Sequence, residues 1–483
     1  MLGFRRWGFV LFLSVVVNAG VAKESPPNVL FIAVDDLNHW VGHLDGHPGT
    51  LTPNIDRLAS EGVTFTRAYT AAPLCNPSRV SLLSGVAPAH SGVYGNYERL
   101  RDKLPDAVTI PQFFRQQGYS VKGAGKIFHR GPGDESYWDE FYIPYDAKKP
   151  ATNAKYPKSY AKRKEGKWAP WGPFDVDDSE MGDAINADRI IVEIEREHDK
   201  PFFLAYGTFK PHLDWRVPRK YFEMHPRESV VLPKVIDNDL DDIPPFGLRL
   251  AREVLDVSND RDFSVPGGDH ANVLKHNQWE AAVQGYLATI TFADAQVGRV
   301  LDALKASPYA DNTIVVLWGD HGWHLGQKEH WRKHTLWEDG LRTTLVISAP
   351  GVSARNARSD RTVSLLDIYP TLVDLIGHAP HESLDGESLV PLLKKPDRRW
   401  TRPVLSTYGY QNHSIRTERW RYIRYHDGTE ELYDHDVDPQ EWTNLAAGSV
   451  KGEHRKVMKR LARHFPKTNV EPVASEIYEK QVK

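Results

Sequence analysis

Two pairs of adjacent residues in this sequence, Asp35-Asp36 and Asp320-His321, have the side chains from which a metal-binding group can form. Asp35 and Asp36 follow an apolar run, and Asp320-His321 follows another. Neighbouring acids in an extended strand point to opposite faces, so both reach one point only where the strand ends. Like charges held together need a compensating cation. A helix cap or a solvated turn explains an isolated Asp-Asp pair as well, but Asp320-His321 at the end of another strand favours a metal site.

Cys75 is the second residue type that stands out, because it is the one cysteine among 483 residues. No intramolecular disulfide can therefore form. The N-terminus predicts export, and a lone thiol in an oxidising compartment is a liability. Cys75 is therefore either a buried bystander, as most free cysteines are, or a residue used in chemistry.

The surroundings of Cys75 favour chemistry. Cys75-Asn76-Pro77-Ser78-Arg79, followed by Leu83-Ser84-Gly85, resembles the sulfatase signature Cys-x-Pro-Ser-Arg with a downstream Leu-x-Gly. The resemblance extends over most of the mature chain and is closest to the iduronate-2-sulfatase subgroup. The segments that carry this closer likeness are Gly125-Lys126-Ile127-Phe128-His129, Lys210-Pro211-His212, Asp320-His321-Gly322-Trp323, and Glu431-Leu432-Tyr433-Asp434 leading to Glu441-Trp442-Thr443-Asn444-Leu445.

The resemblance implies a modified nucleophile. In that family an activating enzyme oxidises the cysteine to formylglycine, an aldehyde, which is hydrated to a geminal diol. One hydroxyl binds the metal and attacks sulfur, and the other lets the covalent sulfate leave by elimination. A serine at position 75 could attack but could not eliminate in this way.

The resemblance also assigns a metal site. Its ligands are Asp35, Asp36, Asp320, His321 and the modified Cys75. Carboxylates and a formylglycine oxygen favour a hard cation, so Ca²⁺ is expected and Mg²⁺ is possible. His321 matches the last ligand of the subgroup, where many other sulfatases have Asn, and an imidazole leaves the identity of the metal open.

Five further residues receive roles in this way. Arg79 lies four residues after Cys75 in an expected helix, so it can reach the nucleophile and neutralise the aspartates. Lys126 and Lys333 match lysines that clamp the sulfate oxygens, although Lys328 and His334 lie close to Lys333 and compete for that assignment. His129 matches the histidine that drives elimination, and His212 the one that protonates the leaving sugar oxygen. For any lone Lys or His, a surface or packing role is the usual alternative.

A parallel sheet is expected to position these residues. Buried-strand patterns at 28–34, 202–206 and 313–318 each end at polar residues, and 345–347 forms another strand. Helical patterns at 52–61, 109–117, 184–195, 279–304 and 364–376 lie between them. We therefore predict an α/β fold with a mostly parallel central sheet and helices on both faces, in which ligands bind at the carboxyl ends of the strands.

The chain is expected to have three parts. Residues 1–22 read as a signal peptide, with Arg5 and Arg6 before an apolar run and Gly20-Val21-Ala22 at the cleavage site. Residues 23–396 form the catalytic domain, with long surface insertions at 131–180 and 226–277. Residues 397–483 form a small α+β subdomain with an antiparallel sheet, a hairpin turn at 426–428 and a helix at 450–465. An uncleaved membrane anchor is the alternative for the N-terminus.

Composition sets the remaining expectations. The net charge of −3 gives no reason to expect nucleic-acid binding. Export without a membrane span after cleavage predicts a secreted or periplasmic protein. The expected partners are a sulfated glycan, with a uronate-containing polysaccharide or oligosaccharide favoured, and a formylglycine-generating or other sulfatase-maturing enzyme. The rival functions are a phosphomonoester or phosphonate monoester hydrolase of the same superfamily and a non-catalytic sulfoglycan-binding protein.

Overall fold

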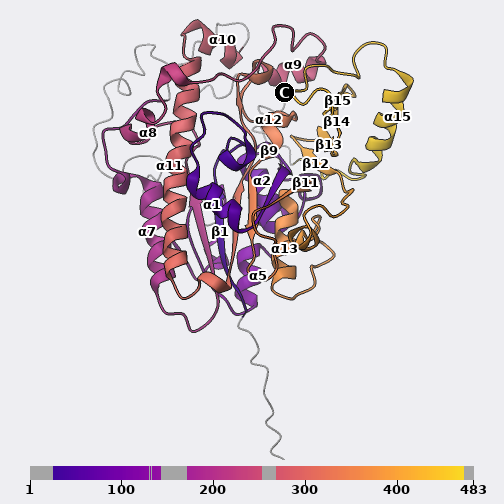
Figure 1. The fold of residues 1–483 in the computed structure, drawn as a ribbon. Helices are drawn as coiled ribbons and strands as arrows, with labels where there is room; N and C mark the ends of the chain where they lie inside the picture. Colours follow the sequence, from indigo (N-terminus) through magenta and orange to yellow (C-terminus); the bar gives the residue numbers. More distant parts are fainter. Residues whose placement is uncertain (1–25, 130, 132, 143–170, 253–267, 473–483) are drawn as a thin grey trace, which may run out of the picture.

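The computed structural model describes residues 26–129, 131, 133–142, 171–252 and 268–472. The expected signal peptide lies outside these residues, as do parts of both expected insertions. A central sheet runs through the molecule with helices on each side, and a smaller sheet lies beside it (Figure 1). This arrangement confirms the predicted α/β class.

The central sheet has nine strands among the described residues, in the order β11-β2-β10-β6-β1-β5-β3-β4, with β9 paired to β2. Strands β6, β1, β5, β3 and β4 pair in parallel, whereas β10 runs antiparallel to both of its neighbours. The strands are β1 (Asn28–Val34), β2 (Val63–Tyr69), β3 (Ser120–Gly125), β4 (Glu140–Tyr142), β5 (Phe202–Thr208), β6 (Thr313–Gly319), β9 (Arg342–Thr343), β10 (Leu345–Ser348) and β11 (Ala357–Ser364).

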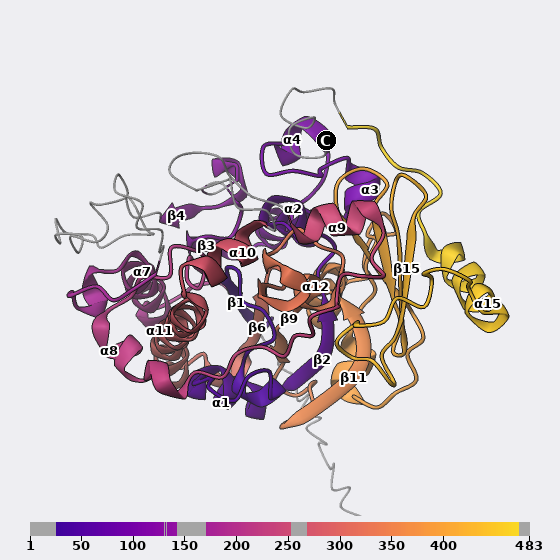
Figure 2. The same ribbon diagram turned by 90° about the horizontal axis from the view of Figure 1, so that it is seen from above.

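The apolar run of β1 is continuous because both faces of the sheet are covered. Val29 and Phe31 pack into the core on one face, and Leu30 and Ile32 pack into the core on the other. Viewed from above, the two groups of helices flank the sheet (Figure 2). One core contains α2 (Cys75–Ser84), α5 (Ile110–Gln116), α13 (Ile368–Leu375) and α14 (Val390–Lys394); the other contains α1 (Pro53–Glu61), α7 (Gly182–Glu195) and α11 (Trp279–Ala306).

Strands β2, β3 and β11 were not predicted. Strand β3, with the sequence Ser-Val-Lys-Gly-Ala-Gly, lacks the apolar run that identifies a buried strand. Gly125 explains part of this composition, because a Cβ there would lie 1.8 Å from the carbonyl oxygen of Gly207 and its φ is +79°. Close contact between β3 and β5 therefore requires small residues, which conceal the strand in the sequence.

The C-terminal region contains the expected antiparallel sheet. Its hairpin turn is confirmed by the hydrogen bond from Tyr425 N to Thr429 O at 2.9 Å. The helix that follows packs on the sheet through Met458 and Leu461. The elements are β12 (Val404–Thr407), β13 (His413–Arg416), β14 (Trp420–Arg424), β15 (Glu430–Asp434) and α15 (Gly452–Leu461).

The expectation of a surface insertion at 226–277 is wrong for its middle part. Leu240, Ile243 and Phe246 are buried against Trp337 and Tyr425, so this stretch joins the main domain to the C-terminal sheet. Its apolar residues are too few and irregularly spaced to predict a core segment. The remaining short elements are α3 (Pro88–Ser91), α4 (Leu100–Lys103), α8 (Arg219–Glu223), α9 (Pro245–Ala251), α10 (Gly268–Lys275), α12 (Glu338–Leu341), β7 (His324–Leu325) and β8 (Trp331–Arg332).

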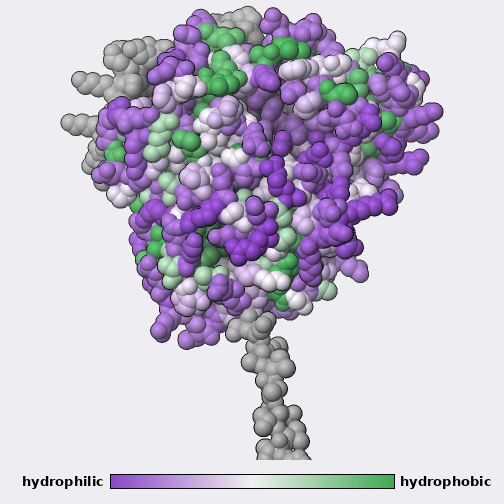
Figure 3. Space-filling view, viewed as in Figure 1, coloured by the Kyte–Doolittle hydropathy of each residue, from purple (hydrophilic) through white to green (hydrophobic). Residues whose placement is uncertain are grey.

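Polar side chains dominate the face shown in Figure 3, and apolar ones are scattered over it. Among the described residues, no helix has both the length and the apolar character needed to cross a membrane.

Candidate active site

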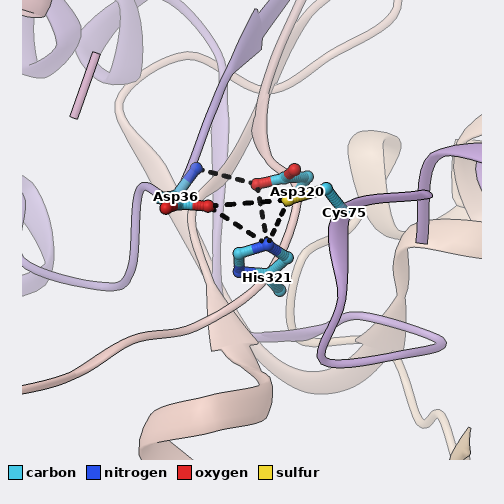
Figure 4. Close-up of side chains that lie close together, drawn as sticks. All are labelled: Asp36, Cys75, Asp320 and His321. Carbon is cyan, nitrogen blue, oxygen red and sulfur yellow. Dashed lines mark hydrogen bonds and ion pairs between the residues drawn. The ribbon is translucent and has the colours of Figure 1, made fainter. Parts of the chain in front are cut away.

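The carboxyl ends of β1 and β6 bring Asp35-Asp36 and Asp320-His321 together. These strands pair in parallel with Val34 opposite Gly319, so Asp35 and Asp320 follow at the same edge of the sheet. Helix α2 begins at Cys75 and brings its first residue to this edge. Figure 4 shows Asp36, Cys75, Asp320 and His321 converging there.

These four residues form a compact group. Each offers one ligand atom, and the atoms lie within 4.8 Å of one another. His321 Nε2 is 3.3 Å from both Cys75 Sγ and Asp36 Oδ1. Asp36 Oδ2 is buried and has no hydrogen-bond donor among the described residues. A buried, unpaired carboxylate oxygen beside a second carboxylate and an imidazole fits a divalent cation, and binding of a metal by these residues stays a prediction.

The adjacent aspartates separate because the backbone turns between them. Asp36 has a φ of 57°, in the left-handed region, and its N–H donates to Asp320 Oδ1 at 2.9 Å. Asp35 instead accepts from Lys126 Nζ at 2.5 Å and from Arg79 Nη2 at 3.1 Å. Asp35 thus lies outside the group of four, although one of its oxygens falls within 4.8 Å of ligand atoms of Asp36 and His212.

Arg79 is fully buried beneath the site. Its Nε donates to Asp320 Oδ2 at 2.9 Å, and its Nη1 donates to the carbonyl oxygens of Lys126 and Ile127. With Asp35 as a further partner, the guanidinium is occupied by protein groups. Arg79 therefore orients two aspartates and neutralises them, and its link to Lys126 fixes the end of β3.

The lysine that faces position 75 is Lys333. Its Nζ lies 2.9 Å from Cys75 Sγ and 2.6 Å from Asp36 Oδ1. Lys328, which competed for this assignment, points away and pairs with Asp239 at 2.5 Å. The charged group of Lys333 thus lies at position 75, whereas that of Lys328 forms an ion pair with the 226–252 segment.

The buried charges shift the pKa values of the acidic groups in different directions. Burial raises the pKa of Cys75, but the charges of Lys126 and Lys333 outweigh burial and lower it to about 6. Burial raises the pKa of Asp36 to about 7 against the opposing charge of Lys333. Burial also opposes ionisation of Asp35, yet Lys126 and other cations hold its pKa well below the usual value. Asp35 is therefore an anion. The pKa values of Asp36 and Cys75 lie near neutrality, so a further positive charge nearby favours their ionised forms.

Two histidines flank these acids. His212 Nε2 lies 3.9 Å from Asp36 Oδ2, and its Nδ1 lies 2.5 Å from the carbonyl oxygen of Leu213. Since a carbonyl only accepts, Nδ1 carries the proton and Nε2 faces the site. His129 Nδ1 is buried without a hydrogen-bond partner among the described residues. Burial and the charge of Lys126 lower the pKa of His129 to about 3, so its ring is neutral.

Sequence reasoning gave no role to Ser78 or Thr70. Ser78 Oγ donates to the carbonyl oxygen of Asp320 at 2.5 Å and accepts from Thr70 Oγ1 at 2.8 Å. This link ties α2 to the end of β6 and fixes Cys75 relative to Asp320. Ser78 lies within the signature motif, which was the available signal, whereas nothing in the sequence marks Thr70.

Comparison with protein families places the chain among known enzymes. The model described as "Sulfatase" matches residues 27–378, and the one described as "N-sulphoglucosamine sulphohydrolase, C-terminal" matches residues 319–470. A sulfatase of Formosa agariphila is 37% identical over 93% of this chain and 88% of its own length. Human iduronate 2-sulfatase is 31% identical over 76% of this chain and 67% of its own.

Solved structures support the fold. A protein in complex with its substrate D-glucosamine-2-N,6-O-disulfate superposes with a TM-score of 0.71 at 21% identity, covering 95% of this chain and 98% of its own. The phosphonate monoester hydrolase of Agrobacterium radiobacter gives 0.72 at 22% identity, covering 90% and 94%. At these identities the likeness shows the fold alone, which is shared by hydrolases of different esters.

Proposed function

The chain belongs to the sulfatase family of sulfuric ester hydrolases, and from this premise we propose that it removes an O-sulfate group from a uronate-containing polysaccharide or oligosaccharide. The observation that carries this proposal is the position of Cys75 Sγ, 2.9 Å from Lys333 Nζ and within the group of Asp36, Asp320 and His321. The likeness to iduronate 2-sulfatase supports a sulfated sugar as substrate.

Formylglycine made from Cys75 supplies the nucleophile in this proposal, as an aldehyde hydrate that a thiol cannot replace. Ca²⁺ or Mg²⁺, held by Asp35, Asp36, Asp320, His321 and position 75, supplies charge that lowers the pKa of a hydroxyl group and offsets the charge of sulfate. A maturing enzyme of the host is required for the modification. The donor set and the unpaired Asp36 Oδ2 support the metal assignment.

Lys126 and Lys333 act on the sulfate anion. A sulfate ester repels an anionic nucleophile, so cations must be in place before the two approach. Lys333 Nζ contacts position 75 directly, and Lys126 is buried beside Asp35. Arg79 holds Asp35 and Asp320 in place through bonds to both, and in this role it need not touch the substrate.

The histidines move protons in opposite directions. His212 is fixed by its Nδ1 contact, so its Nε2 faces the site, and in the doubly protonated imidazolium form Nε2 carries the proton that is donated to the departing sugar oxygen. His129 is neutral, and its buried Nδ1 lacks a protein partner among the described residues. A neutral imidazole accepts a proton, which suits His129 to promote release of the covalent sulfate.

Product analysis on a panel of sulfated oligosaccharides tests this function. Free sulfate and a product 80 Da lighter (the approximate mass of SO₃) are expected from uronate-2-sulfated substrates, together with a hydrazide-reactive aldehyde at position 75. The Cys75→Ala variant is the control. Faster hydrolysis of phenyl phosphonate than of any sulfate would favour the phosphonate monoester hydrolase. Binding of sulfated glycans by an unmodified thiol form without turnover would favour the non-catalytic alternative.

The proposal also includes export of the protein from the cytoplasm. The N-terminal segment, with Arg5 and Arg6 before an apolar run, supports a secreted or periplasmic location. Recovery of mature protein that begins after residue 22 from the periplasm or medium is the expected result, and retention of residues 1–22 on the membrane would contradict it.

A further inference from the structure

The turn that carries Asp36 is held by a residue far away in the sequence. Tyr286, on α11, donates its hydroxyl proton to the carbonyl oxygen of Asp36 at 2.8 Å. The same hydroxyl accepts the N–H of Asn38 at 3.1 Å. One buried phenol therefore bonds both sides of the turn, and it makes these bonds 250 residues away from Asp36.

This turn needs support because Asp36 lies in the left-handed region, with a φ of 57°. A non-glycine residue keeps such a conformation only where its surroundings impose it. Thr343 Oγ1 donates to the carbonyl oxygen of Leu37 at 2.8 Å, which supports the next residue. The N–H of Asp36 is bonded to the Asp320 carboxylate, and Tyr286 supplies the bond to the carbonyl oxygen of Asp36.

The ring of Tyr286 cannot move aside. It packs edge-on against Trp40 with centroids 5.7 Å apart, and it contacts Trp215 at 5.4 Å. It also stacks on Trp323 at 6.3 Å, and Lys333 Nζ lies 5.2 Å from the Trp323 ring centre. These packed aromatic rings thus fix the position of the Asp36 turn relative to Lys333.

We propose that Tyr286 is a positioning residue for the metal site, which fixes the backbone of Asp36 so that its carboxylate faces Asp320 and His321. The inference rests on the proposed function, because it takes Asp36 to be a metal ligand. Tyr286 acts on the backbone of the turn, because its hydroxyl bonds the carbonyl oxygen of Asp36 and the N–H of Asn38. Without the hydroxyl, the left-handed turn is free to relax, and the carboxylate then binds the cation less tightly.

Calcium titration of the Tyr286→Phe variant tests this inference. The substitution removes one oxygen and keeps the ring packing. We expect calcium affinity, measured calorimetrically after removal of bound metal, to fall on the order of tenfold, as for the loss of a supporting group around a metal ligand. The calcium-induced rise in Tm should shrink accordingly. Each variant is compared with the unchanged protein with position 75 in the same state, as checked by mass.

Tyr206→Phe is the matched control. Tyr206 is also fully buried, and its hydroxyl donates to a backbone carbonyl, that of Asp183, at 3.0 Å. Tyr286→Phe loses two hydrogen bonds and Tyr206→Phe loses one, so both variants should lose stability in chelator, Tyr286→Phe the more. Only Tyr286→Phe should lose calcium affinity.

Equal calcium affinities for Tyr286→Phe and the unchanged protein would overturn the inference and leave the proposed function standing. An equal loss in Tyr206→Phe would also overturn it, because the effect would then be a general consequence of losing a buried hydroxyl. Absence of calcium and magnesium binding by the unchanged protein would overturn the metal part of the proposed function and the inference together.

Discussion

Two clusters of buried charge include residues at the two ends of the 322–337 segment, Asp320 and Glu338, and they differ in how fully their polar atoms are paired. The active-site cluster comprises Asp35, Asp36, Asp320, Arg79, Lys126 and Lys333. The subdomain cluster comprises Glu338, Glu441, Arg416, Arg421 and His435, and it joins the main domain to the C-terminal sheet.

In the subdomain cluster every carboxylate oxygen has a partner. Glu338 accepts from Tyr69 at 2.8 Å through one oxygen, and from Arg416 and Arg421 through the other. Glu441 accepts from Arg421 and His435 through one oxygen, and from the N–H of Glu338 through the other. Although two glutamates and a histidine lie close enough to hold a metal, two guanidinium groups already occupy them. We call this cluster closed because its carboxylate oxygens are all paired within the protein. It stabilises the contact between the C-terminal sheet and the rest of the molecule.

We call the active-site cluster open because some buried polar atoms in it and beside it have no partner among the described residues. Asp36 Oδ2 and His129 Nδ1 are buried and have no hydrogen-bond partner among the described residues. Leaving a buried polar atom unpaired costs about 1–3 kcal/mol, so such atoms persist where a ligand or function uses them. The comparison teaches that buried charge alone does not mark a site. In this pair of clusters, the one proposed as the active site is the one with unpaired buried atoms.

The largest expected effect is on the nucleophile. Cys75→Ala removes the group from which formylglycine is made, so turnover of sulfate esters should fall by about 10⁶. Stability should change little, since Cys75 contributes a small side chain to an already polar site. Steady-state rates and thermal unfolding measure the two quantities. Activity within tenfold of the unchanged protein would show that position 75 carries no nucleophile.

The next effect separates the two histidines of the open cluster. A general acid matters most for a poor leaving group and contributes about 10² to 10⁴ in rate. His212→Ala should therefore slow hydrolysis of a sugar sulfate by such a factor and that of nitrophenyl sulfate far less. His129→Ala should slow both alike and let sulfated enzyme accumulate, because elimination follows departure of either leaving group.

The ratio of turnover rates on the two substrates, with intact mass after substrate soaking, decides between these roles. If His129→Ala shows the leaving-group dependence and His212→Ala traps sulfate, the assignments are reversed. If neither variant changes either quantity, both histidines are structural.

The closed cluster should respond in stability rather than in chemistry. Arg421→Ala leaves Glu338 and Glu441 buried with fewer partners, so the free energy of unfolding should fall by about 3–5 kcal/mol. Turnover per folded molecule should stay within about twofold. Denaturant unfolding and active-site-normalised rates measure these effects. A loss of turnover larger than the loss of folded protein would mean that this cluster takes part in catalysis.

Arg419→Ala is the matched control for that variant. Arg419 lies two residues away, pairs with Asp434 at 2.7 Å, and has half of its side chain exposed. An exposed pair contributes about 0–1 kcal/mol, so the control should lose far less stability than Arg421→Ala.

The sequence predicts the open cluster better than the closed one. Asp35, Asp36 and Cys75 lie in short motifs next to strand and helix ends, where local pattern fixes both element and residue. The three parallel strands β1, β5 and β6 were predicted because their apolar runs are continuous. The structure places Asp36, Asp320, His321 and Lys333 at position 75 and Asp35 beside this group, while the roles of all the residues that the resemblance assigned stay predictions.

The closed cluster escaped prediction for a physical reason. Glu338, Arg421 and Glu441 look like ordinary surface charges, since their burial depends on partners up to 269 residues away in the chain. Strand β3 escaped because close packing requires small residues there. Tyr286 escaped because its hydroxyl meets Asp36 across 250 residues. Long-range pairing of polar groups leaves no periodic signal.

The smallest expected effect concerns the loop between the clusters. His324 is fully buried, with Nε2 2.7 Å from Thr335 Oγ1. Burial lowers its pKa well below the usual value of about 6.5. Below pH 6.5 the unfolded chain therefore binds a proton that the folded chain does not, so stability rises with pH and is lost as pH falls. One such histidine accounts for at most about 1.4 kcal/mol per pH unit.

His324→Gln tests this contribution, since glutamine can still bond Thr335 and carries no titrating group. The unfolding free energy of the variant should fall less steeply between pH 6.5 and 5 than that of the unchanged protein. His381→Gln, at an exposed histidine, controls for the loss of a histidine as such. Equal pH dependences of the unfolding free energy for His324→Gln and the unchanged protein would contradict this contribution. They would mean that the loop opens on acidification, so that the two clusters respond to pH together and not independently.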